Sequence, residues 1–306
     1  MTGRAESPTD GITVRLRGGL GNQLFQFAAG SAVADRLACP LFVDTGPLAA
    51  VLPGDTPRAY ELDWLVDPAN VLAGSTSGLA GRLLRRAARH VPIQVGAKTF
   101  TEGSFAYDAN IAAVQPGTTL EGYFQSWRYF DSIEVPLRSK LQVVAPRSQW
   151  RASMEEELSA SGPWTAVHVR RGDYLKPRNS AYHGLLGPSY YHAALAELAG
   201  RGLDHRVVLF SDDPDAAAGL VDPEAAQVEI VRPPADTNPI ESVLLMSRAT
   251  AVVTANSSFS WWAAWLADPL GSTVVCPAPW LSAAGADERD LRPPQWLTID
   301  AGFTSA

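Results

Sequence analysis

Short apolar runs alternate with longer stretches of helical spacing along most of this chain, and each short run predicts a buried strand. The first run, residues 12–17, alternates apolar and polar positions and leads through glycines into a helix of small residues over 24–34. After an irregular middle stretch, the pattern resumes with an apolar strand at 164–170. Further strands are predicted at 41–43, 119–125, 206–210, 228–231, 251–254 and 273–276, and further helices at 153–159, 189–199, 239–248 and 259–267.

Two series of this kind predict the fold class. Strands that alternate with helices form parallel sheets joined by right-handed crossovers. A stretch containing Pro136, Pro146 and Pro163 separates the two series. We therefore predict an α/β fold of two Rossmann-like, doubly wound lobes with a cleft between them, at residues 1–155 and 156–306. In open sheets of this type, ligands bind beyond the carboxyl ends of the strands.

Size and charge narrow the range of partners. The chain has 306 residues, of which 46% are hydrophobic and 19% charged, so it is long enough for one large domain or two smaller ones. Its formal net charge of −7 argues against nucleic acid as the main partner, because nucleic-acid-binding proteins usually carry a basic face. Cys39 and Cys276 each lie in an apolar run, which favours two small core residues and a reducing compartment.

These features lead us to expect a cytoplasmic protein. Residues 1–11 lack the basic and apolar segments of a signal peptide, and no run of 18 apolar residues occurs that could cross a membrane. Arginines at positions 82, 85, 86 and 89 predict a short basic helix, whose charged side is interpreted as a solvated face. Contact of this helix with an anionic acceptor, or peripherally with the inner membrane, is the alternative.

Three strands of the second series end in polar residues. The residues at these ends are His168, Arg170, Arg171 and Asp173; Ser211, Asp212 and Asp213; and Asn256, Ser257, Ser258 and Ser260. In a parallel sheet they lie along one edge, where they combine cations, carboxylates and a helix N-terminus. Arginine and helix N-termini bind phosphate, and a carboxylate accepts hydrogen bonds from a guanine edge. The combination matches a nucleoside diphosphate.

Each strand end also has a structural interpretation that the sequence leaves open. The two arginines can be solvated surface charges. Asp213 before Pro214 can cap a helix, which leaves Asp212 for a ligand. Ser257 or Ser258 can likewise cap the helix that follows.

Two further patterns are read as structural rather than catalytic. The order Asp213, Pro214, Asp215 resembles a metal-binding D-x-D, but Pro214 favours the start of a helix and no second acidic cluster is evident. Three aromatic residues are interpreted as part of the core or of a lobe interface: Trp261, Trp262 and Trp265.

The glycine turn after the first strand is another place where a ligand can approach the backbone. Gly19 and Gly21 do not form a complete G-x-G-x-x-G, because the next position of that pattern is Leu24, so a plain tight turn is the alternative. Asn22 and Gln23 place two amides at the start of the helix, where one of them can instead act as its cap.

Three segments closely resemble motifs of the bacterial α-1,2-fucosyltransferases, glycosyltransferase family 11. They are residues 18–26 (GGLGNQLFQ), 168–173 (HVRRGD) and 256–262 (NSSFSWW). The resemblance covers nearly the whole chain in order, apart from residues 45–118. It implies a fold of GT-B type, GDP-β-L-fucose as donor, no metal or other cofactor, and inversion at the sugar carbon. It also implies that the first lobe binds the glycan acceptor and the second lobe the GDP-sugar.

Carried over by position, the resemblance makes Arg170 the arginine that holds the β-phosphate, and it places Asn22 near the reacting centre. His168 would contact the diphosphate or the ribose, and Asp212 or Asp213 would recognise guanine. The other donor-binding positions that it implies are Gly19, Gly21, Gln23, Arg171, Asn256, Ser257, Ser258 and Phe259.

The general base is the point at which this chain departs from related enzymes. The α-1,6-fucosyltransferases have a glutamate where this chain has Arg178. Asp173 is therefore the first candidate for the base and His183 the second, whereas a structural pairing of Asp173 with Arg171 is the alternative.

The predicted reaction is transfer of L-fucose to a glycan hydroxyl, with O2 of galactose as the first choice. Another GDP-deoxyhexose as donor is one alternative. A non-catalytic module that binds nucleotide sugars or glycans is the other.

Overall fold

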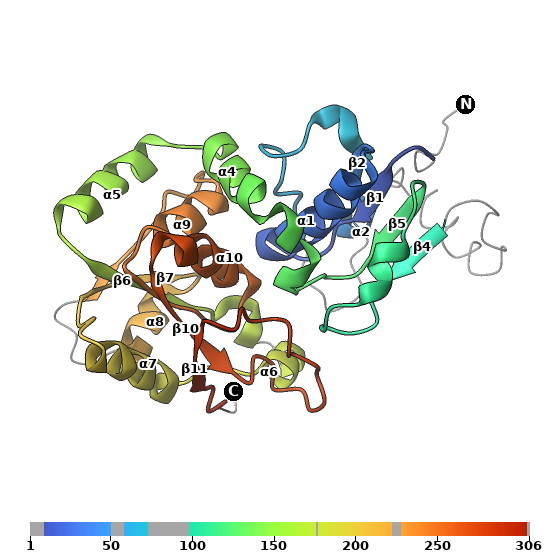
Figure 1. The fold of residues 1–306 in the computed structure, drawn as a ribbon. Coiled ribbons are helices and arrows are strands. Elements are labelled where there is room, and N and C mark those ends of the chain that lie inside the picture. Colours follow the sequence, from blue (N-terminus) through green and yellow to red (C-terminus); the bar gives the residue numbers. More distant parts are fainter. Residues whose placement is uncertain (1–8, 50–57, 73–97, 176, 222–227, 305–306) are drawn as a thin grey trace. The chain divides into compact units, whose positions relative to one another are not determined.

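The computed structural model describes residues 9–49, 58–72, 98–175, 177–221 and 228–304, with residues 173, 175 and 177–179 described by their backbone alone. The chain forms two compact units, each a parallel sheet with helices (Figure 1). Unit 1 comprises Met1–Val144 with Arg289–Leu291, and unit 2 comprises Ala145–Glu288 with Arg292–Ala306. Two Rossmann-like units confirm the predicted α/β class of GT-B type.

In the described part of unit 1, five strands form a parallel sheet with the order β3-β2-β1-β5-β4. Its strands are β1 (Ile12–Arg15), β2 (Leu41–Asp44), β3 (Val71–Leu72), β4 (Lys98–Thr101) and β5 (Thr118–Glu121). Its helices are α1 (Leu20–Leu37), α2 (Gly46–Ala49) and α4 (Glu134–Val144), with 3-10 turns at Pro68–Asn70, Ala109–Ala113, Trp127–Tyr129 and Asp131–Ile133.

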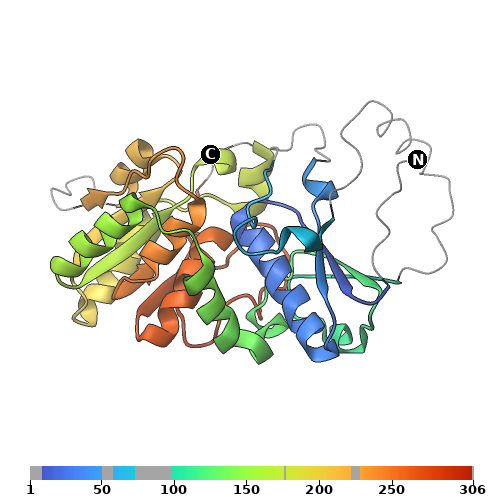
Figure 2. The same cartoon turned by 90° about the horizontal axis from the view of Figure 1, so that it is seen from above.

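Helix α1 packs closely on this sheet because its residues are small. It follows β1 in the chain and contacts β1 and β2 (Figure 2). A Cβ atom on Gly30 would lie only 2.8 Å from Cδ1 of Leu41 and 3.4 Å from Cβ of Val14. The prediction that small residues bring this helix close to the sheet is therefore confirmed.

Helix α1 begins four residues before the predicted start at residue 24. Gly19 is its N-cap and makes no side-chain hydrogen bond, so Asn22 and Gln23 lie within the first turn and neither of them caps the helix. The turn depends on Gly18, whose φ of +77° is unfavourable for other residues. A Cβ atom added at this position would collide with the side chain of Asn22. Backbone geometry rather than a polar cap starts the helix.

Six strands among the described residues of unit 2 form a parallel sheet with the order β11-β10-β9-β6-β7-β8. Its strands are β6 (Trp164–Val169), β7 (Arg206–Ser211), β8 (Val228–Ile230), β9 (Ala251–Val253), β10 (Thr273–Ala278) and β11 (Leu297–Asp300). Its helices are α5 (Gln149–Ala160), α6 (Pro177–His183), α7 (Pro188–Gly200), α8 (Pro214–Val221), α9 (Pro239–Met246) and α10 (Ser258–Ala267).

The change from one unit to the other comes at Val144 and Ala145, whereas residue 155, the predicted lobe boundary, lies inside α5. Helix α5 belongs to unit 2 because its N-terminus is tied to α9. Both the backbone N–H and the hydroxyl of Ser148 donate to the carboxylate of Glu241 over 2.7 Å, and Glu241 is only 2% exposed. A buried carboxylate with two short hydrogen bonds anchors the chain at this point.

The core of unit 2 includes an aromatic cluster formed by tryptophans of α10 together with Trp296. Trp261 and Trp262 are fully buried, and Trp265 and Trp296 are nearly so. Their ring centroids lie 5.2–6.2 Å apart, in edge-to-face, tilted and stacked pairs. The interpretation of the α10 tryptophans as core residues is confirmed. Among the described helices, none combines the length and the apolar character needed to cross a membrane.

Candidate functional site

The carboxyl edge of the unit 2 sheet brings the three predicted strand ends together. Strand β6 is paired on one side with β7 and on the other with β9, so the residues that follow these strands are neighbours. Val169 is in register with Ser211, which places Arg170 beside Asp212. The juxtaposition expected from the sequence is therefore present.

Arg170 and Asp212 form an ion pair at this edge. Nη1 of Arg170 lies 2.9 Å from Oδ2 of Asp212, and their side chains are 22% and 26% exposed. Oδ1 of Asp212 accepts the backbone N–H of Arg171 over 2.9 Å. Both carboxylate oxygens thus bind protein donors from the segment that follows β6, and recognition of guanine by Asp212 stays a prediction.

Asp213 has a local structural role. Its Oδ1 accepts the N–H of Ala216 over 3.3 Å in the first turn of α8, and its own N–H donates to the hydroxyl of Ser211. Asp215 pairs with Arg232 on the surface, 2.6 Å away. In the described part of the chain, no group of three or more His, Cys, Asp or Glu residues is arranged to hold a metal ion.

His168 is buried at the end of β6 and is held neutral. It is 4% exposed, its ring lies 5.5 Å from that of Phe259, and its Nδ1 atom has no hydrogen-bond partner among the described residues. Burial, reinforced by the positive charge of Arg170, lowers the pKa of His168 from 6.5 to about 3. A neutral imidazole with an unused nitrogen suits a hydrogen bond to an uncharged group such as a ribose hydroxyl.

The lowered pKa of His168 predicts a pH-dependent stability. Between about 3 and 6.5 the unfolded chain binds a proton at His168 that the folded protein does not, so the free energy of unfolding rises with pH across this window. Urea unfolding between about pH 5 and pH 7 should be less pH-dependent in His168→Gln than in the wild type. If the free energy of unfolding depended on pH equally in the two proteins, His168 would have an ordinary pKa in the folded state.

The loop before α10 connects the third strand end to α6. Asn256 is 2% exposed, and its Nδ2 donates to the carbonyls of His183 and Gly184 over 2.8 and 3.3 Å. Ser257 is the N-cap of α10 and accepts the N–H of Phe259 through its hydroxyl. Ser258 is the first helical residue. The capping interpretation holds for Ser257, and phosphate binding by Ser257 and Ser258 stays a prediction.

Tyr174 is a member of this site that sequence reasoning missed. Its hydroxyl donates to the carbonyl of Asn256 over 3.0 Å, and its ring stacks on that of His183 with centroids 4.5 Å apart. The guanidinium carbon of Arg170 lies 5.7 Å from the centroid of the same ring. The only sequence signal for Tyr174 is its position directly after the Arg-Arg-Gly-Asp segment. The side chain of Asp173, the first candidate for the base, lies outside the described residues, as does that of Arg178.

The residues predicted in the glycine turn of unit 1 have mixed roles. Oδ1 of Asn22 accepts a hydrogen bond of 2.6 Å from the Gln125 side chain. Gln23 is fully buried, and its amide bonds the carbonyls of Gly18 and Ala59 and the N–H of Glu61. The structure thus gives Gln23 a bracing role in unit 1 instead of an accessible amide. Gly19 and Gly21 lie at the N-cap and in the first turn of α1.

A charged network that the sequence did not reveal lies at the carboxyl edge of the unit 1 sheet. Arg15, at the end of β1, pairs with Asp44 at the end of β2 over 3.4 Å and with Glu121 at the end of β5. Arg17 lies 3.9 Å from the same Glu121 carboxylate. These charges neutralise one another within unit 1.

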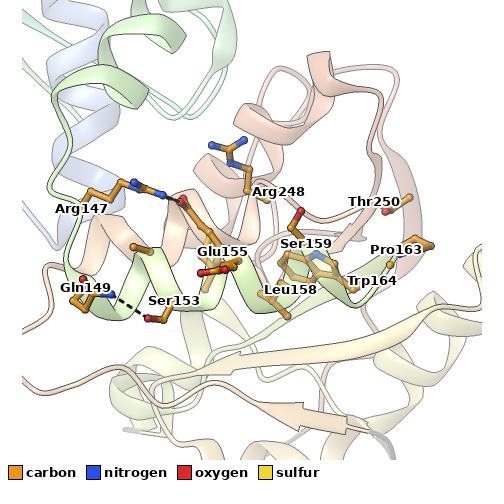
Figure 3. A pocket seen from close by; sticks show the side chains of 14 residues that line it. Arg147, Gln149, Ser153, Glu155, Leu158, Ser159, Pro163, Trp164, Arg248 and Thr250 are labelled. Carbon is orange, nitrogen blue, oxygen red and sulfur yellow. Dashed lines mark hydrogen bonds and ion pairs between the residues drawn. The ribbon is translucent and has the colours of Figure 1, made fainter.

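A separate groove of about 620 Å³ lies along α5, where it is lined by Arg147, Ser153, Glu155, Trp164 and Arg248 among others (Figure 3). Trp164 is the first residue of β6, so this groove is at the amino end of the strand, whereas Arg170 follows its carboxyl end. Two of its charged residues, Arg147 and Glu155, pair with each other, since Nη2 of Arg147 lies 2.9 Å from Oε2 of Glu155. The groove is therefore distinct from the predicted site.

Comparison with known proteins identifies the family. The profile of Glycosyl transferase family 11 matches residues 112–300, more than half of the chain. An α-1,2-colitosyltransferase of Escherichia coli is 28% identical over 295 residues, which cover 94% of this chain and 99% of that enzyme. The O-antigen biosynthesis glycosyltransferase WbnK of Escherichia coli is 27% identical over 93% of this chain and 99% of its own length.

Other matches cover less of the chain or have a lower sequence identity. A galactoside α-(1,2)-fucosyltransferase 1 of Alouatta belzebul is 25% identical over 52% of this chain and 45% of its own length. The crystal structure of the fucosyltransferase NodZ from Bradyrhizobium aligns with a TM-score of 0.46 and 16% identity, over 84% of this chain and 92% of NodZ. On the strength of the profile match, which includes the strand ends at His168, Asp212 and Asn256, the chain belongs to glycosyltransferase family 11.

Proposed function

We propose that this glycosyltransferase moves L-fucose from GDP-β-L-fucose to a glycan hydroxyl, with O2 of galactose as the acceptor atom. The observation that carries the proposal is the Arg170–Asp212 pair at the carboxyl edge of the unit 2 sheet, beside the N-terminus of α10. A fixed guanidinium and a helix N-terminus at one sheet edge are suited to a diphosphate. Relatives named as α-1,2-colitosyl- and α-(1,2)-fucosyltransferases support the linkage.

The chemistry assigns one task to each group. As the bond between the sugar and GDP breaks, negative charge grows on the β-phosphate, and Arg170 stabilises it without a metal. His168, which is neutral, hydrogen-bonds the ribose or the diphosphate through a ring nitrogen. Asp173 takes the proton of the acceptor hydroxyl, which attacks from the opposite face and inverts the sugar carbon. Asn22 contacts the reacting sugar.

A colitosyl donor is the second candidate. It is favoured by the E. coli α-1,2-colitosyltransferase, whose similarity extends over 94% of this chain. Colitose is fucose without the hydroxyl at carbon 3, so the two donors differ by one polar group. A site that hydrogen-bonds this hydroxyl rejects the donor that lacks it, because the partner group would be left unpaired.

A donor panel tests the proposal. We expect transfer from GDP-fucose to galactose-terminated oligosaccharides, detected by mass spectrometry, with full activity in excess EDTA. Faster transfer from GDP-colitose would assign the second candidate. GDP binding without any product would favour a non-catalytic module, and a strict requirement for Mg²⁺ or Mn²⁺ would contradict the mechanism. The matched control replaces GDP-fucose by GDP-mannose, which is also a GDP-sugar but retains the hydroxyl at carbon 6.

A further inference from the structure

We propose that Tyr174 and Asp212 are positioning residues that hold the Arg170 guanidinium from two sides before the donor binds. The inference rests on the proposed role of Arg170 at the β-phosphate and deepens it. It assigns a function to Tyr174 and explains why a glycine occupies position 172.

Asp212 fixes one end of the guanidinium in a defined direction. The carboxylate is itself held in place, because Oδ2 contacts Nη1 of Arg170 while Oδ1 accepts the N–H of Arg171, each over 2.9 Å. Gly172 leaves room for this arrangement. A Cβ atom on Gly172 would collide with Oδ2 of Asp212, so any larger residue must displace the carboxylate from Arg170.

Tyr174 provides the second side. The guanidinium carbon of Arg170 lies 5.7 Å from the centroid of the Tyr174 ring, within the range of about 6 Å for a cation–π contact. The ring cannot swing away freely, because its hydroxyl is bonded to the carbonyl of Asn256 and its face is stacked on His183 at an interplanar angle of 8°.

Asn256 contacts both Tyr174 and His183, on which the Tyr174 ring stacks. Its backbone carbonyl accepts the Tyr174 hydroxyl, and its side-chain amide donates to the carbonyl of His183 over 2.8 Å. The 2% exposed Asn256 thus acts on Arg170 through Tyr174. An arginine that is already fixed stabilises the charge of the leaving group without reorganising during the reaction.

The test compares the affinities for GDP and GMP, which differ by the β-phosphate alone. The ratio of the two dissociation constants, measured by calorimetry, reports the Arg170 contact. We expect Tyr174→Leu to lower the preference for GDP about threefold, as loss of a cation–π contact implies. Gly172→Ala should lower it about tenfold, because it displaces the Asp212 hydrogen bonds while it retains both charges. In each variant kcat should fall, and in Tyr174→Leu, which leaves Asp212 in place, the affinity for GMP should change less than twofold.

A second measurement does not depend on the nucleotide. In the ligand-free protein, ¹⁵N relaxation should show a well-ordered Arg170 Nε–H that becomes mobile in Tyr174→Leu and Gly172→Ala, and less so in Tyr174→Phe, which keeps the ring. Asp215→Asn is the matched control. Like Asp212, Asp215 follows β7 and pairs with an arginine, but its ion pair with Arg232 is exposed. This variant should leave Arg170 unchanged.

The outcomes separate the two proposals. Unchanged order of Arg170 in Tyr174→Leu and Gly172→Ala, or an equal loss of GDP and GMP affinity, would overturn the positioning role. Wild-type protein that does not prefer GDP to GMP would contradict the proposed function, while the order of Arg170 would still decide whether Tyr174 and Asp212 hold it.

Discussion

Arg170→Ala is expected to lower kcat for sugar transfer by about 100–1000-fold, the loss typical when one preorganised charge stabiliser is removed. The side chain is 22% exposed and aligned by Asp212 at the sheet edge where the diphosphate is proposed to bind. Because its interaction strengthens as charge develops on GDP, kcat should fall more than KM rises. Steady-state kinetics with GDP-fucose and an excess of acceptor measure the effect.

Two comparisons make this result specific. Arg170→Lys retains the charge but loses the planar fork, so its kcat should lie between those of the wild type and the alanine variant. Arg232→Ala removes an arginine that is also paired with an aspartate but is 54% exposed, and it should retain normal turnover. Near-normal activity of Arg170→Ala would refute the assignment of Arg170 to the β-phosphate.

Trp261→Ala is expected to reduce the free energy of unfolding by about 3–5 kcal/mol, the usual cost of truncating a large buried aromatic residue. Trp261 is fully buried, and its ring packs against those of Trp262, Trp265 and Trp296. The cavity would lie in the layer that carries the N-terminus of α10. Urea unfolding followed by circular dichroism measures the change without relying on tryptophan fluorescence.

The control for this prediction is Leu270→Ala. Leu270 follows α10 in the chain and is 60% exposed, so its loss should change stability by less than about 0.5 kcal/mol. If Trp261→Ala were no more destabilising than Leu270→Ala, the aromatic cluster would not contribute to the core as its burial indicates.

Much of the fold could be predicted because its signals are local. The strands from β6 to β10 are apolar runs bounded by polar residues, and the structure places strands at each of those runs. Strand β11 was missed because Leu297–Asp300 alternates intermediate and exposed positions at the sheet edge. The sequence does not predict helix α6, since its 7 residues have no apolar periodicity. The start of α1 was misplaced because backbone conformation at Gly18 and Gly19 sets it.

Part of the site could also be predicted, because some of its residues have local sequence signals. Arg170, Asp212 and Asn256 were recognised because polar residues at the ends of apolar strands stand out in a sequence. Their partners were not, because hydrogen bonds such as Tyr174 to Asn256 join residues 82 positions apart. The sequence predicts a ligand-binding amide at Gln23, whereas the partners of this side chain, Ala59 and Glu61, come from a segment without a recognisable pattern.

The sequence by itself determined that this protein has two parallel α/β units, which residues end their strands, and which family it resembles. These properties follow from hydrophobic periodicity and from short motifs, and both are read over a few neighbouring residues. The tertiary structure alone decided that β6 lies between β7 and β9, and hence that Asp212 contacts Arg170 and that the hydroxyl of Tyr174 meets the carbonyl of Asn256. Strand order depends on how distant segments pack together, so no local pattern specifies which charge meets which partner.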